Sequence, residues 1–277
     1  MGNAYYKIEQ LNSHLYRIIG ITNEFSYLVI GKRKALLIDT CCGIKGIRQI
    51  VDSLTSLPYD VVLTHGHVDH VGGVGFFNDK NIYLNKNDFK SAKFQSKQMF
   101  IKSYIKGNFK LTHVALPIPK NNDISKNHVA KYLELRENDT FDLGDLSVTF
   151  LSLYGHTKGM MTALINEDKI IILSDSCNPS TFLFLPGCLT IKEYLTSLEK
   201  YQAKTEGKYN KVLLSHLPKE CDQNEVEEMI ALVKGILNGQ KNEDTMKIGF
   251  YKVKIAKKIN PKTGFNDEIT KANLFYK

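Results

Sequence analysis

The stretch from Tyr59 to Gly73, YDVVLTHGHVDHVGG, constrains what this chain can fold into more than any other part of it. Residues 61–63 are β-branched or apolar and are typical of a buried strand. The strand ends where a polar cluster begins, comprising His65, His67, Asp69 and His70. Imidazole and carboxylate ligands suit zinc, iron or manganese rather than calcium or magnesium. We therefore predict a metal site at this strand end rather than a loop of surface histidines.

This motif, T-H-x-H-x-D-H-x-G-G, resembles that of the metallo-β-lactamase-fold hydrolases, and the resemblance extends over most of the chain. Each of the later motifs ends an apolar, strand-like run, where α/β sheets present functional groups. The positions are Asp39 after KALLI, His156 after LSVTFLSLY, Asp175 after KIIILS and His216 after KVLLS.

The resemblance implies a dinuclear centre. It assigns His65, His67 and His156 to one metal and Asp69, His70 and His216 to the other, with Asp175 bridging the two. Asp39 would orient a ligand histidine through a hydrogen bond. Five of the eight histidines are used in this way, and we interpret His14, His113 and His128 as ordinary surface or core residues.

Two divalent metal ions, with zinc preferred and manganese or iron as alternatives, would hold a bridging hydroxide for attack on an electrophilic carbonyl or phosphorus. Asp69 and Asp175 would position that hydroxide. We expect hydrolysis of a small ester, thioester or lactone, close to the glyoxalase II-like or lactonase-like branch. Two alternatives stay open: an iron-dependent sulfur dioxygenase, and a nucleic-acid phosphodiesterase, which would bind RNA or DNA in a strongly salt-dependent manner.

The resemblance also implies the fold, an αββα sandwich of two mixed β-sheets flanked by helices. Short strands are expected within residues 14–39, a helix over 43–54, strands over 60–64 and 81–86, and a second β-rich half after residue 125. Capping residues favour helices after Thr190 and from Asp222 to Leu237, followed by a closing hairpin. We expect one domain over residues 1–277, with a C-terminal helix and hairpin over 222–277.

Residues 87–120 are less standard, because an amphipathic pattern that includes Phe94, Met99 and Tyr104 is interspersed with lysines. One interpretation is a lid that binds an acyl or aromatic group and an anion; the other is a helix packed on the sheet edge with a solvated lysine face. The loop after Asp175 offers Asn178, Phe182 and Phe184 as walls of a substrate pocket, although packing under the following helix is the favoured alternative. Asn178 stands where the lactonases carry tyrosine.

Composition bears on the class of substrate, the state of the cysteines and the cellular compartment. The net charge is +8, but the lysines are spread along the chain without an arginine-rich or aromatic-interleaved tract. This argues against nucleic acid and indicates at most a preference for anionic small molecules. Five cysteines without a C-x-x-C pair indicate reduced thiols. The absence of an N-terminal signal-peptide core and of any apolar run near the ~20 residues of a membrane span favours the cytoplasm.

Overall fold

The computed structural model describes residues 4–112, 118–126, 131–260 and 271–277. The chain divides into two compact units, residues 1–149 and 150–277, and each is described by itself. His113 and His128, which the sequence analysis assigned no special role, lie outside the described residues.

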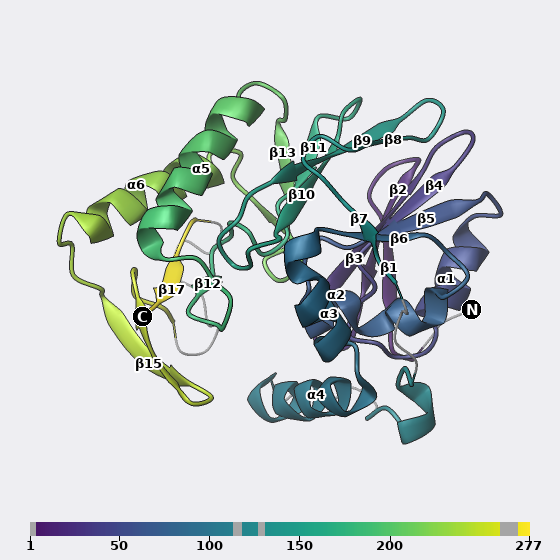
Figure 1. The fold of residues 1–277 in the computed structure, drawn as a ribbon, viewed down its shortest axis with the longest axis horizontal. Coiled ribbons are helices and arrows are strands. Elements are labelled where there is room, and N and C mark those ends of the chain that lie inside the picture. Colours follow the sequence, from purple (N-terminus) through teal and green to yellow (C-terminus); the bar gives the residue numbers. More distant parts are fainter. Residues whose placement is uncertain (1–3, 113–117, 127–130, 261–270) are drawn as a thin grey trace. The chain divides into compact units, whose positions relative to one another are not determined.

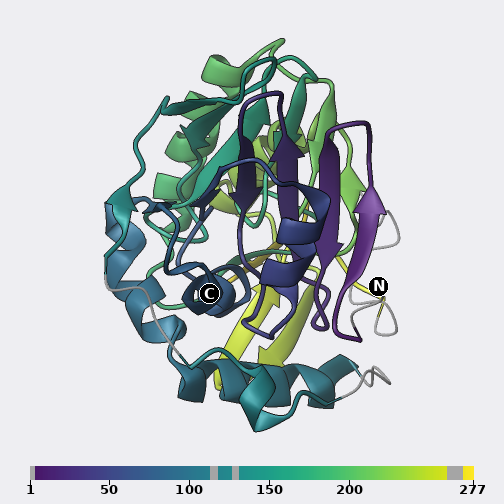
Figure 2. The same cartoon turned by 90° about the vertical axis from the view of Figure 1, so that its right-hand side faces the viewer.

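The first unit contains a mixed seven-stranded sheet in which the strands follow one another in chain order. The strands are β1 (Lys7–Gln10), β2 (Leu15–Ile19), β3 (Phe25–Ile30), β4 (Ala35–Ile38), β5 (Tyr59–Val62), β6 (Ile82–Leu84) and β7 (Leu133–Glu134). Pairing is antiparallel from β1 to β4 and parallel from β4 to β7. The antiparallel part is formed by the purple strands, which stand side by side in Figure 2. The strands predicted within residues 14–39, over 60–64 and over 81–86 are confirmed, with shorter bounds; β1 was not predicted.

Helices of the first unit include α1 (Ile47–Leu54) and α2 (Val68–Val71), together with η1 (Gly72–Phe77). The helix expected over 43–54 begins at Ile47 instead, because Gly43 and Gly46 have φ values of 90° and 111° that a helix cannot include. From there α1 buries Ile47, Ile50 and Val51, the face that the helical period predicted.

The segment expected as one basic helix is three elements, η2 (Lys86–Asp88), α3 (Phe89–Gln95) and α4 (Gln98–Thr112), followed by η3 (Asn121–Asp123). The chain leaves the helix at Ser96, which is itself buried. In Figure 1, α4 is the blue-green helix drawn below the other helices of the first unit. Its Ile101 and Ile105 side chains are buried in the core of that unit.

A hairpin lies at the boundary between the units. β8 (Thr140–Asp142) pairs antiparallel with the first residues of β9 (Ser147–Ser152), with the turn at Gly144 and Asp145 as predicted. The sheet of the second unit then has the order β14-β13-β11-β10-β9. Its further strands are β10 (Met161–Ile165), β11 (Ile170–Ile172), β13 (Lys211–Leu213) and β14 (Glu220–Cys221).

Two helices of the second unit, α5 (Ile191–Thr205) and α6 (Glu225–Leu237), pack against each other (Figure 1). Both were predicted, and the capping box of Thr190 and Glu193 is present at the start of α5. The predicted C-terminal hairpin is part of a larger sheet. A four-stranded sheet combines β12 (Thr181–Leu183), β17 (Leu274–Tyr276), β16 (Tyr251–Ile255) and β15 (Asp244–Ile248), in that order.

Mixed sheets flanked by helices in both units confirm the predicted α/β class. Among the helices that the structure describes, none has both the length and the hydropathy needed to cross a membrane.

Candidate metal centre

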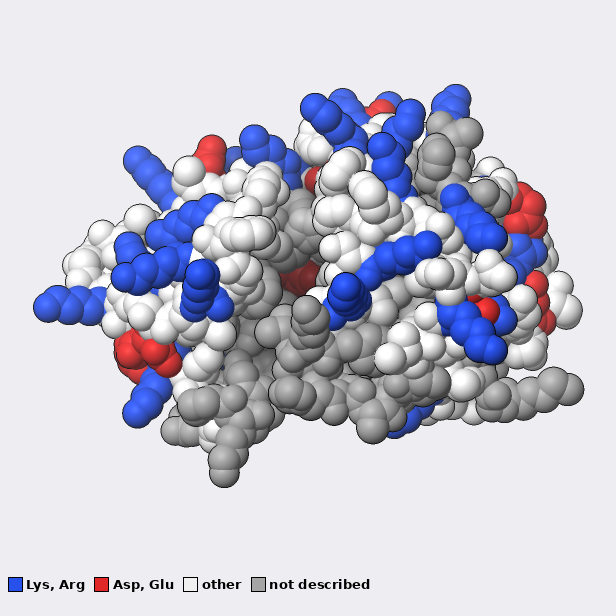
Figure 3. All heavy atoms as spheres, turned by 90° about the horizontal axis from the view of Figure 1, so that it is seen from below, with Lys and Arg blue, Asp and Glu red and all other residues white. Residues whose placement is uncertain are grey.

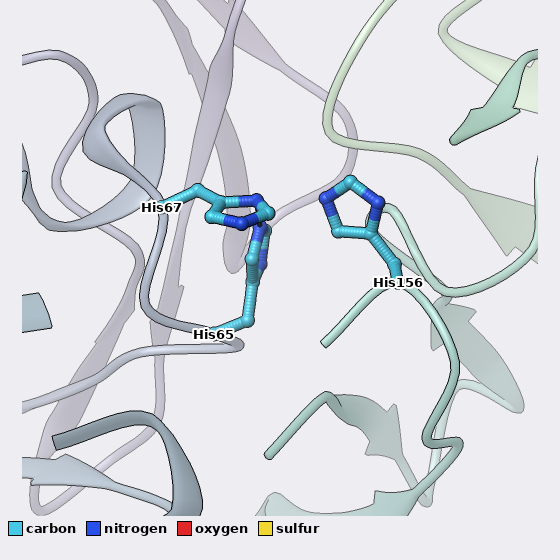
Figure 4. Close-up of side chains that lie close together, drawn as sticks. All are labelled: His65, His67 and His156. Carbon is cyan, nitrogen blue, oxygen red and sulfur yellow. Dashed lines mark hydrogen bonds between the residues drawn. The ribbon is translucent and has the colours of Figure 1, made fainter. Parts of the chain in front are cut away.

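The first two predicted ligands, His65 and His67, lie on the loop that directly follows β5 (Figure 4). The Nε2 atom of His65 is 3.2 Å from the Nδ1 atom of His67. Two nitrogens bound to one tetrahedral zinc ion at about 2.0–2.1 Å would be about 3.3 Å apart. The two imidazoles therefore already have the spacing of ligands on a single zinc ion.

Asp69 and His70 follow on α2, in the same unit. The Nε2 atom of His70 is 4.0 Å from a carboxylate oxygen of Asp69, Oδ2. The opposite ring atom of His70, Nδ1, is 2.8 Å from the Oδ2 atom of Asp39. A carboxylate on Nδ1 fixes the tautomer of the ring and directs Nε2 toward a metal. The predicted orienting role of Asp39 thus has a partner of the right type.

Asp39 is itself held firmly at the end of β4. Its two carboxylate oxygens accept hydrogen bonds from the backbone N–H and the hydroxyl of Thr64, each at 2.8 Å. The residue is 1% exposed, and its φ of 63° is unusual for any residue other than glycine. A strained backbone that persists at a buried carboxylate indicates that its surroundings determine its position.

Two glycines explain why the motif ends in G-G. A Cβ atom on Gly72 would lie 2.4 Å from the carbonyl carbon of Cys42, and one on Gly73 would lie 2.2 Å from the carbonyl oxygen of Thr40. Both distances are shorter than any real contact, and both involve backbone that cannot move aside. The close approach places the loop after β5 against the loop after β4, which carries Asp39.

One contact at this centre comes from the predicted lid segment. The hydroxyl of Tyr104, on α4, donates a hydrogen bond of 2.9 Å to Oδ2 of Asp69. Burial and the neighbouring Asp69 carboxylate raise the pKa of the Tyr104 hydroxyl well above its usual value, so the hydroxyl keeps its proton. From the sequence, Tyr104 was interpreted only as one position of an amphipathic pattern. A periodic pattern does not identify the hydrogen-bond partner of a side-chain hydroxyl.

In the second unit, His156 lies on the loop after β9 and is also drawn in Figure 4. Its Nδ1 atom is 2.8 Å from the backbone carbonyl oxygen of Phe182, which fixes the tautomer with Nε2 as the ligand atom. No sequence pattern could have identified this partner, because any residue at position 182 supplies a carbonyl.

Asp175 lies between the two histidines of the second unit. Its Oδ2 atom is 3.6 Å from Nε2 of His156 and 3.5 Å from Nε2 of His216. The parallel pairing of β11 with β13 explains the second distance. Ile172 is paired with Leu213, and Asp175 and His216 each follow three residues later. Two parallel strands thus deliver both groups to one edge of the sheet.

Two of the three loop residues proposed for a substrate pocket, Phe182 and Phe184, pack against other side chains of the second unit. Phe184 is buried among side chains of the C-terminal sheet, including Val253, Ile255 and Phe275, and Phe182 packs against that cluster. Both side chains therefore contribute to the core of the C-terminal sheet. Asn178 is half-buried and its side chain accepts a hydrogen bond from the backbone N–H of Ser180. Whether these residues contact a substrate stays a prediction.

Comparisons with known proteins agree with this architecture. A family model described as the metallo-beta-lactamase superfamily matches residues 19–216. A relative from Gallus gallus, acyl-coenzyme A thioesterase MBLAC2, is 21% identical over 207 residues, which cover 69% of this chain and 71% of the relative.

Solved structures show the same fold at low identity. The metallo-beta-lactamase from Pontibacter korlensis has a TM-score of 0.57 at 15% identity and covers 83% of this chain and 99% of its own. A double mutant of the sec-alkyl sulfatase PisA1 has a TM-score of 0.64 at 13% identity, covering 86% of this chain but 44% of its own. With the family model matching well over half of its residues, this chain belongs to the metallo-beta-lactamase superfamily and is a metal-dependent hydrolase.

Proposed function

We propose that residues 1–277 act as one metallo-β-lactamase-fold domain that binds two divalent metal ions, most readily zinc. His65, His67 and His156 would bind one ion and Asp69, His70 and His216 the other, with Asp175 bridging both. The observation that carries this proposal is the position of Asp175. Its Oδ2 atom is 3.6 Å and 3.5 Å from histidines assigned to two different ions, as a bridging carboxylate requires.

The donor set fits such ions. All the proposed ligand atoms are imidazole nitrogens or carboxylate oxygens, and two of the imidazoles have Nδ1 on an acceptor, Asp39 or the Phe182 carbonyl. A metal-binding histidine usually donates a hydrogen bond from its other ring nitrogen to such an acceptor. The chemistry that a pair of bound ions supplies is a water of lowered pKa and a polarised scissile carbonyl. Within this chain, Asp69 and Asp175 would orient that water and accept its hydrogen bonds.

The substrate we propose is a small ester, lactone or thioester, with an acyl thioester preferred. The relative from Gallus gallus is named an acyl-coenzyme A thioesterase, and its similarity covers most of both chains. In the first unit, α4 offers a shallow cavity of about 270 Å³, lined by Phe100, Ser103, Tyr104, Gly107 and Asn108. Ligand pockets typically start near 300 Å³, so this cavity suits part of a ligand, such as a short acyl chain.

The surroundings of this cavity suit an acyl compound that is also anionic. The exposed ring of Phe94 contacts Phe100 of the cavity wall, with 5.3 Å between the ring centres, and the Nζ atom of Lys97 lies 5.5 Å from the ring centre of Phe94. Elsewhere, Figure 3 shows lysine and arginine side chains scattered over the visible face rather than gathered into one stripe. Scattered positive charge supports a small anionic substrate more than a nucleic acid, which needs a continuous basic track. The five free cysteines support the cytoplasm as the compartment.

The first experiment is elemental analysis of protein purified without added metal, combined with hydrolysis assays on thioesters and lactones. Two zinc or manganese ions per chain and thioester turnover would support the proposal. One iron ion with oxygen uptake on a persulfide would replace it with the sulfur dioxygenase alternative. The absence of any metal, without rescue by added zinc, would contradict the assigned ligands.

Gly107 offers a separate test of the acyl cavity. A Cβ atom built there meets no other atom within 4 Å, so a larger side chain would enter open space. Gly107→Leu should raise KM for the longer acyl substrates and leave the zinc content unchanged. Gly107→Ala is the control for helix propensity, which favours alanine by about 1 kcal/mol. A KM that is the same for both variants and the wild type would remove this cavity from the substrate site.

A further inference from the structure

Tyr104 connects two features of the first unit that are otherwise separate. Its hydroxyl reaches the carboxylate of Asp69, on α2, with a hydrogen bond of 2.9 Å across 35 positions in the sequence. Its ring forms part of the wall of the α4 cavity. The helices α2 and α4 are in direct contact, so the hydrogen bond lies within a packed interface.

The hydroxyl of Tyr104 is difficult to explain by packing alone. A hydroxyl turned inward without a partner would lose about 1–3 kcal/mol, so a phenylalanine would pack there at lower cost if only the ring mattered. A carboxylate oxygen has two lone pairs, and Oδ2 of Asp69 can therefore accept from Tyr104 and still face a metal ion. The contact fixes the side-chain torsion angles of Asp69, the aspartate of the motif that also lies 4.0 Å from Nε2 of His70.

We propose that Tyr104 is a positioning residue of the hydrolytic centre: its hydroxyl holds the Asp69 carboxylate in the orientation needed to bind metal and to orient the attacking water. This inference rests on the proposed function. It makes α4 a part of the active centre. Partners that orient a metal ligand typically contribute 10- to 100-fold to metal affinity or activity.

The same unit contains a matched control. The hydroxyl of Tyr59 donates a hydrogen bond of 2.7 Å to Asp52, a pair of the same chemistry and similar length. Neither Tyr59 nor Asp52 is a predicted ligand, and Asp52 lies on α1. Tyr59→Phe therefore removes an equivalent hydrogen bond without touching the proposed centre.

The test compares Tyr104→Phe with Tyr59→Phe and the wild type. Calorimetric titration of the metal-free proteins with zinc should show two ions in each case, with the weaker site of Tyr104→Phe about 10- to 100-fold weaker. With a thioester substrate, kcat should fall while KM stays the same, because the ring remains in the cavity wall. Tyr59→Phe should match the wild type in zinc affinity and in kcat. Denaturant unfolding of the metal-free variants checks that both fold.

The outcomes separate this inference from the proposed function. Wild-type zinc affinity in Tyr104→Phe would overturn the role of Tyr104, whatever the activity. An equal loss in Tyr59→Phe would also overturn it, since the effect would then be one of general stability. If the wild type binds two zinc ions but hydrolyses no ester, lactone or thioester, the proposed function fails while the calorimetry still decides on Tyr104. A wild type that binds no zinc contradicts both.

Discussion

The two units hold their predicted ligands in different ways. In the first unit, His65, His67, Asp69 and His70 lie within one short loop and helix after β5. Side chains hold that segment: Asp39 contacts His70 at 2.8 Å and Tyr104 contacts Asp69 at 2.9 Å. In the second unit, His156, Asp175 and His216 lie on three separate loops, and the contact that fixes His156 is a backbone carbonyl.

Buried carboxyl groups show a similar contrast. Asp39 is 1% exposed and accepts two hydrogen bonds from Thr64 in addition to its contact with His70. Glu225, in the second unit, is 0% exposed, and neither of its carboxyl oxygens has a hydrogen-bond partner within the described part of the chain. The first unit therefore uses a buried, hydrogen-bonded carboxylate to arrange ligands, whereas the second contains a buried acid whose oxygens accept no hydrogen bond within the described residues.

Side-chain substitutions around the ligands should therefore affect the first unit more. Its ligand geometry depends on individual carboxylates and hydroxyls, each of which a single mutation can delete. In the second unit, the parallel pairing of β11 and β13 sets the distance between Asp175 and His216, and backbone pairing is insensitive to most substitutions.

Removing one ligand from each unit should have the largest effect. We expect His67→Ala and Asp175→Ala each to reduce hydrolysis to background without unfolding the protein. They should differ in metal content: His67→Ala loses mainly one ion, whereas Asp175→Ala weakens both because it bridges them. Elemental analysis after dialysis measures this, with His14→Ala as the control. Full turnover in either variant would contradict the ligand assignment.

The next effect concerns the buried acid of the second unit. Burial and the neighbouring Glu228 raise the pKa of Glu225 from 4.5 to about 9. The folded state therefore keeps this proton over a pH range in which the unfolded state releases it. As a result, the contribution of Glu225 to stability falls as pH rises from 4.5 and levels off above about 9. At 1.36 kcal/mol per pKa unit, the loss at pH 7 is up to about 3 kcal/mol.

Glu225→Gln should remove this loss. The variant should be more stable than the wild type at pH 7, with a difference that shrinks toward pH 5, as measured by urea unfolding of metal-free protein. Glu227→Gln is the matched control, since Glu227 lies two residues away on the same helix but is exposed. A stability difference that does not change with pH would show that the proton on Glu225 is not responsible.

Two substitutions can distinguish how His70 and His156 are held. Asp39→Asn keeps the shape of the side chain but replaces the charged acceptor of His70 with an amide, and we expect metal affinity to fall about 10- to 100-fold. Phe182→Ala deletes a ring but retains the carbonyl that contacts His156, so affinity should change little. Zinc titration of both variants measures the contrast. Equal losses would mean that the second unit depends on side chains as much as the first.

The same distinction explains how far the sequence could predict the structure. The motif from His65 to Gly73 could be interpreted from the sequence because its ligand types are contiguous, and Asp39, Asp175 and His216 because each ends an apolar run. The contact of Tyr104 with Asp69 could not be predicted from the sequence, because it joins distant segments. The contact of the Phe182 carbonyl with His156 could not be predicted either, because it uses only backbone on the side of Phe182. The strand β12 was missed for a similar reason, because its pairing with β17 spans about ninety residues from Thr181 to Leu274.

The smallest expected effect distinguishes two tyrosines. Tyr194, on α5, is the counterpart of Tyr104 in the second unit, but its hydroxyl donates to the backbone carbonyl of Ser176 at 2.6 Å. Its ring packs beside Gly155, where a Cβ atom would lie 2.3 Å from it. Tyr194 thus supports the loops beside His156 and Asp175 without a hydrogen bond to either side chain among the contacts described here.

Tyr194→Phe should therefore lower the free energy of unfolding by about 1–2 kcal/mol, the cost of one buried hydrogen bond and the carbonyl left behind. Zinc affinity should stay at the wild-type value, in contrast to Tyr104→Phe. Urea unfolding and zinc titration of the two variants in parallel provide the measurement. If Tyr194→Phe lost zinc affinity as strongly as Tyr104→Phe, backbone support would matter as much as direct contact with a ligand, and the difference drawn between the two units would no longer hold.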